Sequence, residues 1–117
     1  MKPIMCGIDR IEADPGTLKN QKVGLITNHT GVNRELESTI DILKESGNLA
    51  CLFAPEHGVR GELQAGAAVS DAIDKNSGVK AYSLYGKNRK PTEAMLRDVD
   101  TLVYDIQDVG ARYYTYL

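Results

Sequence analysis

The chain has 117 residues, of which 42% are hydrophobic and 26% are charged. These proportions exclude a disordered, collagen-like or coiled-coil chain, and the length allows one domain or part of one. Fourteen basic and sixteen acidic residues give a net charge of −2, without the strongly basic stretch that nucleic acid binding requires. No apolar run reaches the roughly 18 residues of a membrane span, and the start of the chain does not resemble a signal peptide.

Short apolar runs alternate with helical stretches, which is typical of α/β units around a parallel sheet. In chain order we expect a short strand and helical turn within 5–12, a strand at 22–27, a helix at 35–46, strands at 49–54 and 79–84, a helix at 91–97 and a strand at 100–106. Residues 56–78 show little periodicity, which predicts a long loop with at most a short helix near 69–73.

Two features support this assignment of elements. The helix at 35–46 places Leu36, Ile40 and Leu43 on one face, with Thr39 as a further candidate for that face, and Gly47 stands where helices commonly end. The run at 49–54 is continuously apolar, as expected of a strand that is covered on both faces.

The two cysteines, Cys6 and Cys51, are too far apart for a CxxC redox or zinc motif. Each stands in an apolar context, where cysteine usually behaves as a small buried hydrophobic residue. We therefore expect two buried free thiols.

Polar residues follow each of the four main predicted strands: Asn28, Glu56, Tyr85 and Asp105 come directly after the strands or at their ends. In an open parallel sheet, ligands bind outside the carboxyl ends of the strands. These four residues should therefore line one cleft, with the side chains of Glu56 and Asp105 within about 12 Å of each other, given a strand spacing of ~4.8 Å.

Each of the two carboxylates has a functional and a structural interpretation. Glu56 stands between Pro55 and a Gly-containing loop, where it could act on a ligand, cap the next turn or pair with Arg60. Asp105 ends an apolar strand, a half-buried setting in which carboxylates often serve function. Its alternative role is a hydrogen bond to a neighbouring loop.

Two carboxylates in one cleft are what glycoside hydrolysis requires, and also what a magnesium site requires. His29 and His57 lack the spacing of a metal motif. Neither a dinucleotide-binding GxGxxG motif nor a P-loop is present, so a prediction of nucleotide binding would rest on analogy of fold alone.

The chain ends on a tyrosine-rich segment without a polar cap. Tyr113, Tyr114 and Tyr116 could stack on a sugar ring or pack in a core. An apolar segment of this kind normally has a partner, so we expect the chain to be a fragment of a longer protein.

Four ordered motifs identify a family. They are GLITNHTGV at 24–32, FAPEHGVRG at 53–61, YSLYG at 82–86 with KPT at 90–92, and DIQDVGARYYTY at 105–116. Together they resemble the NamZ-type (YbbC-like) exo-β-N-acetylmuramidases, a bacterial family formerly called a domain of unknown function. The resemblance covers the chain from about residue 7 to its end.

The resemblance implies an α/β, Rossmann-like three-layer domain with a mainly parallel sheet, joined to a smaller C-terminal domain. Residues 1–117 would form the N-terminal part of the Rossmann-like catalytic domain. The implied activity releases N-acetylmuramic acid from the non-reducing end of peptidoglycan fragments, with Glu56 as the catalytic residue. The substrate partners are muramyl saccharides, and no cofactor, metal, nucleic acid or membrane span is expected.

Combining the strand-end pattern with the resemblance, we expect Glu56 and Asp105 to be catalytic. The candidate substrate-binding residues are Asn28, His57, Arg60, Tyr85, Gln107, Asp108, Arg112 and Tyr113. The alternative is a carbohydrate- or small-ligand-binding module that uses the same loops without chemistry.

Overall fold

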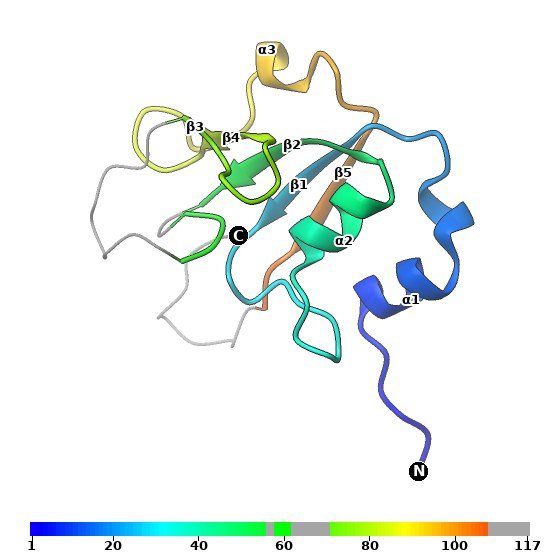
Figure 1. Ribbon diagram of the computed structural model, residues 1–117. Helices are drawn as coiled ribbons and strands as arrows, with labels where there is room; N and C mark the ends of the chain where they lie inside the picture. The colour runs from blue at the N-terminus through cyan, green and yellow to red at the C-terminus, as the bar shows by residue number, and fades with distance from the viewer. Residues whose placement is uncertain (56–57, 62–70, 108–117) are drawn as a thin grey trace.

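The computed structural model describes residues 1–55, 58–61 and 71–107, and its central feature is a sheet with the strand order β3-β4-β2-β1-β5 (Figure 1). The strands are β1 (Val23–Thr27), β2 (Leu49–Ala54), β3 (Ala72–Ile73), β4 (Lys80–Ser83) and β5 (Thr101–Asp105). The helices are α1 (Gly7–Ala13), α2 (Thr39–Glu45) and α3 (Glu93–Leu96), with a 3₁₀ turn at Pro15–Leu18.

The sheet is mainly parallel, as the sequence predicts. β1 lies between β2 and β5 and is parallel to both, and β4 is parallel to β2. Only the two-residue β3 runs antiparallel to its neighbour, β4, among the strands of the described part of the chain. The α/β class is therefore confirmed.

One face of the sheet forms the main core. Leu25 of β1 and Leu52 of β2 pair in register and are fully buried. They pack with Ile40 and Leu43 of α2 in a single apolar cluster. Ser38 starts α2, because its hydroxyl accepts a hydrogen bond from the Ile40 amide at 3.3 Å.

The other face is built around Gly24. A Cβ atom at this position would lie 2.9 Å from Phe53 and 3.1 Å from both Val99 and Leu102, so only glycine fits. Phe53 also stacks on Tyr82, with ring centroids 5.7 Å apart. Val99, just before β5, and Leu102, within β5, therefore pack on the face of the sheet opposite α2.

The helix predicted at 35–46 begins four residues late, at Thr39. Asn33 is the cause, because its Oδ1 accepts the amides of Glu35 and Glu37 at 3.0 and 2.8 Å and so holds these residues in a loop. The placement of Leu36 on the buried face was wrong: the residue is 79% exposed, with a φ of 65°.

Three further expectations need correction. The described end of the predicted 69–73 helix, Ala72–Ile73, is strand β3, because its backbone pairs with β4. Of the two free thiols, Cys51 is buried as expected, but Cys6 is exposed, because it precedes α1 outside the core. Near the N-terminus, the helical turn expected within 5–12 is α1, and no strand accompanies it among the residues described there.

Candidate functional site

The strand order creates a topological switch point between β1 and β5. From β1 the chain moves to β2 on one side, and later returns to place β5 on the other side. In open α/β sheets the crevice at such a point, outside the carboxyl ends of the strands, is where ligands bind. Asn28 follows β1 here, and Asp105 ends β5 in register with Thr27.

The amide side chain of Asn28 is held in one orientation. Asn28 is 2% exposed, and its Oδ1 accepts hydrogen bonds from the Thr30 amide at 2.9 Å and the Thr30 hydroxyl at 2.6 Å. Because a backbone amide can only donate, the Oδ1 atom must face Thr30. The Nδ2 donor then points elsewhere, and it is buried without a hydrogen-bond partner among the described residues.

An unpaired buried donor is costly, at about 1–3 kcal/mol, and calls for a reason in each native structure where it occurs. At the carboxyl edge of a parallel sheet, the simplest reason is an acceptor that arrives with a ligand. Asn28 is thus the described residue that most directly points to a binding function.

The carboxylate of Asp105 is anchored to α2. Its Oδ2 accepts a hydrogen bond of 2.5 Å from the hydroxyl of Thr39, the first residue of that helix, and its backbone carbonyl accepts one of 2.7 Å from the Thr27 hydroxyl. Both threonines are essentially fully buried. The Asp105 carboxylate therefore makes a structural hydrogen bond, but to helix α2 and not to the neighbouring loop that was expected, and a catalytic role stays a prediction.

Gly31 allows this close packing. A Cβ atom at residue 31 would lie 2.2 Å from the Thr27 hydroxyl oxygen and 2.9 Å from the Asp105 carbonyl oxygen. The backbone carbonyl of Gly31 also accepts a hydrogen bond from the Thr39 amide at 3.0 Å. Any larger residue would push apart the ends of β1 and β5.

Thr30 connects the two strand ends. Besides donating to Asn28, its hydroxyl accepts the Gln107 amide at 2.9 Å. This places Gln107 next to the loop after β1, although the contact uses its backbone rather than its side chain. Tyr85 follows β4 at the same edge, two strands from β1, and is 38% exposed.

The remaining expected site residues lie outside the described residues: Glu56, His57, Asp108, Arg112 and Tyr113. The residues on either side of 56–57 contact each other, since the Gly58 amide donates a hydrogen bond to the Pro55 carbonyl at 3.2 Å. Their roles, and the distance from Glu56 to Asp105, stay predictions.

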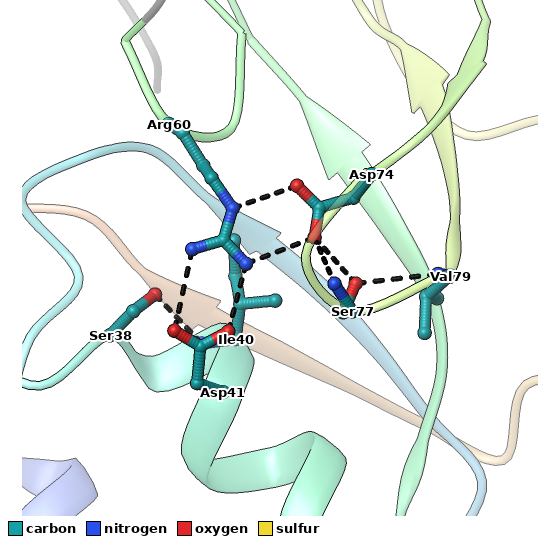
Figure 2. Close-up of polar contacts among 7 residues, drawn as sticks. All are labelled: Ser38, Ile40, Asp41, Arg60, Asp74, Ser77 and Val79. Atoms are coloured by element: carbon teal, nitrogen blue, oxygen red, sulfur yellow. Dashed lines mark hydrogen bonds and ion pairs between the residues drawn. The ribbon is translucent and has the colours of Figure 1, made fainter.

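Arg60 lies between two carboxylates (Figure 2). Its Nε and Nη2 atoms contact Asp74 at 2.7 and 2.9 Å, and Nη2 also contacts Asp41 at 2.8 Å. Hydrogen bonds to Arg60 lower the pKa of Asp74 to about 2, so this carboxylate is ionised at neutral pH. The same contacts raise the pKa of Arg60 further above its usual value.

Sequence reasoning missed these supporting residues. Helical spacing offers Thr39 for the buried face of its helix, but it does not indicate Asp105 as its partner. Asp41 and Asp74 stand far along the chain from Arg60, and no local spacing marks them. Thr30 carries a weak signal, because Asn-x-Thr turns often close by side-chain hydrogen bonds.

Two classes of site are not seen within residues 1–55, 58–61 and 71–107. No group of three or more His, Cys, Asp or Glu side chains could hold a metal ion there. No helix in these segments is long and apolar enough to cross a membrane.

Comparison with known proteins identifies the family. The family model described as "Exo-beta-N-acetylmuramidase NamZ, N-terminal" matches residues 23–117. The chain belongs to the NamZ family. A curated relative, the peptidoglycan β-N-acetylmuramidase NamZ of Bacillus subtilis strain 168, is 53% identical over 117 residues, which cover 97% of this chain and 28% of the relative.

Solved structures of DUF1343 family proteins from Bacteroides fragilis NCTC 9343 share the fold of this NamZ-family chain. One has a TM-score of 0.82 at 51% identity and covers 96% of this chain and 28% of its own. A second has a TM-score of 0.74 at 37% identity and covers 98% of this chain and 29% of its own. The chain thus spans less than a third of the length of these relatives.

Proposed function

We propose that this chain supplies the first part of a glycoside hydrolase that releases N-acetylmuramic acid from the non-reducing end of peptidoglycan fragments. Membership of the NamZ family and the name of the Bacillus subtilis relative support this assignment. In this proposal residues 1–117 are the N-terminal part of a Rossmann-like catalytic domain, and the activity belongs to the whole protein.

The buried Nδ2 donor of Asn28 is the observation that carries the proposal. Muramyl saccharides present hydroxyl, carbonyl and carboxylate oxygens, any of which could accept this hydrogen bond. The donor lies at the switch point of the sheet, beside β2, whose end leads through Pro55 to Glu56. A ligand bound by Asn28 is therefore one strand spacing, about 5 Å, from the end of the strand that carries Glu56.

Glu56 acts in this proposal as the general acid that protonates the leaving glycosidic oxygen. Asp105 is the second carboxylate, as base, nucleophile or sugar ligand. β2 and β5 flank β1, so the ends of these two strands lie about 10 Å apart. Side chains that extend toward each other from these ends can bring their carboxylates to the shorter separation that glycoside hydrolases use. Around them, substrate contacts are assigned to Asn28, His57, Tyr85, Gln107, Asp108, Arg112 and Tyr113.

Glu56→Gln in the full-length protein tests the assignment. Glutamine keeps the shape of the side chain but cannot donate a proton to the leaving group. Turnover of a chromogenic muramyl glycoside should fall at least ~100-fold, while binding of N-acetylmuramic acid, followed by calorimetry, should change little.

Glu45→Gln is the matched control, because it makes the same chemical change on the exposed end of α2 and should leave turnover at the wild-type level. Wild-type hydrolysis by Glu56→Gln would remove Glu56 from the mechanism. Binding of the sugar without hydrolysis by the wild-type protein would favour the non-catalytic binding module.

A further inference from the structure

Arg60 joins three separate parts of the fold through its guanidinium group (Figure 2). It stands in the segment after β2, whereas Asp41 belongs to the first turn of α2 and Asp74 directly follows β3. With Asp74 the contact is bidentate, which fixes the plane of the guanidinium as well as its position.

The donors of Arg60 are largely occupied by these two carboxylates. An arginine side chain has five N–H groups, and the contacts to Asp74 and Asp41 use Nε, both groups on Nη2 and one on Nη1, the last at 3.4 Å. The side chain is only 16% exposed. This geometry suits an internal support better than a ligand for a substrate anion.

Asp74 is itself held rigidly. Its side chain is 5% exposed, and its Oδ2 accepts the Ser77 amide at 2.8 Å and the Ser77 hydroxyl at 2.6 Å. Its backbone amide donates to the Val79 carbonyl at 2.9 Å. The carboxylate that receives Arg60 therefore cannot shift without disturbing the turn between β3 and β4.

The segment that carries Arg60 is anchored on both sides. Val59 is buried in the main core, and the Gly58 amide donates to Pro55 at the end of β2. Gly61 has a φ of 71°, and its Cα approaches the His29 ring so closely that a Cβ atom would lie 2.9 Å from Nδ1. Residues 58–61 thus contact the loop after β1, the helix α2 and the β3–β4 turn.

We propose that Arg60 is a positioning residue that fixes the segment after β2, and with it Glu56, by acting through Asp74 and Asp41 rather than by touching the substrate. The proposal rests on the proposed function, in which Glu56 is the general acid. Glu56 stands four residues before Arg60, between Pro55 and Gly58, so displacement of the anchored segment moves the point from which Glu56 projects. Small displacements of this kind are expensive in catalysis, about 10²-fold for roughly 1 Å.

Asp74→Asn in the full-length protein is the decisive variant, because it leaves Arg60 intact but weakens its support. Arg60→Lys keeps the positive charge but loses the planar fork. With a chromogenic muramyl glycoside, each should lower kcat by ~10- to 100-fold through misplacement of the acid. KM should stay within about threefold, because the substrate contacts are unchanged.

The double variant separates a shared role from two independent ones. If Arg60 acts through Asp74, then Arg60→Lys combined with Asp74→Asn should be no slower than the slower single variant. The pH profile of kcat should shift in the same direction for both single variants, because both alter the surroundings of the same acid. Arg97→Lys, an exposed arginine near α3, is the matched control and should match the wild-type enzyme.

Two results would overturn the proposal. Direct substrate binding predicts that Arg60→Lys raises KM while Asp74→Asn leaves kcat/KM near the wild-type value. A purely stabilising role predicts wild-type kcat and pH profile in both variants, measured well below a lowered melting temperature.

If either variant fails to fold, Asp41→Asn replaces it, because Asp41 is half-exposed; an unchanged kcat and pH profile in that variant then counts against the proposal. Failure of the wild-type enzyme to hydrolyse the glycoside, or full activity of Glu56→Gln, would instead reject the proposed function.

Discussion

The hydroxyl of Thr39 donates a 2.5 Å hydrogen bond to the carboxylate of Asp105, 66 residues further along the chain. This contact ties the start of α2 to the carboxyl end of β5, and it lies directly beside Gly31. It therefore determines where the Asp105 side chain can be when a ligand occupies the switch point.

Thr39→Val should lower the free energy of unfolding by about 1–3 kcal/mol, because it keeps the volume of the side chain but leaves the carboxylate without this donor. Thr39→Ser retains the hydroxyl and should cost about 1 kcal/mol, for the lost methyl group alone. Urea unfolding of both variants measures the difference. A Thr39→Val protein as stable as the wild type would show that the hydrogen bond contributes nothing to stability.

Gly31→Ala should be destabilising by about 1–3 kcal/mol, since its Cβ would overlap the Thr27 hydroxyl and the Asp105 carbonyl. Gly7→Ala provides the comparison, because a Cβ there meets nothing within 4 Å and alanine favours the helix. Thermal unfolding should separate the two variants clearly. A Gly31→Ala protein as stable as Gly7→Ala would contradict the tight packing at this edge.

Asn28→Asp distinguishes a binding role of Asn28 from a local one. Aspartate keeps an oxygen for the two Thr30 donors but replaces the Nδ2 donor with a second acceptor. Turnover of a muramyl glycoside should fall at least about tenfold, the equivalent of one lost hydrogen bond. Asn20→Asp, on an exposed residue at the opposite edge, should be fully active; full activity of Asn28→Asp would leave the residue only a structural role.

Asp74 makes the stability of this domain depend on acidic pH. The pKa of the Asp74 carboxyl is about 2 in the folded state and 3.8 in the unfolded chain. The ion pair therefore stabilises the fold fully above about pH 4, and this contribution is lost as the pH falls toward 2. A shift of this size corresponds to about 2 kcal/mol. Asp74→Asn should flatten the dependence of unfolding free energy on pH over this range, and an unchanged slope would contradict the assignment.

The four longer strands were predictable from the sequence because each is a short apolar run bounded by turn residues, whereas the two-residue β3 was not. Leu49–Ala54 matches its predicted bounds, and β1, β4 and β5 lie within theirs. The start of α2 was not predictable from periodicity, since the Asn33 side chain takes the amides that an earlier helical turn would have used. Competition by the Asn33 side chain for these backbone amides therefore determines where α2 begins.

The edge at which Asn28, Tyr85 and Asp105 lie was predictable, because parallel strands align their carboxyl ends. The contacts within that edge were not. The partner of Asp105 is Thr39, and the partners of Arg60 are Asp41 and Asp74, all brought together by the fold from distant positions in the chain. Periodicity indicates which face of an element is buried, but it does not indicate which polar groups meet there.

The position of β1 between β2 and β5 affects how the protein is made. Thr27 meets its hydrogen-bond partner Asp105 only after 78 further residues have been synthesised. During translation, β1, α2 and β2 can pack first, while the side of β1 that β5 will cover presents unpaired backbone groups. Such an edge readily pairs with other chains, and non-local pairing is slow. Shielding of nascent β1 by a chaperone should therefore raise the soluble yield of the protein.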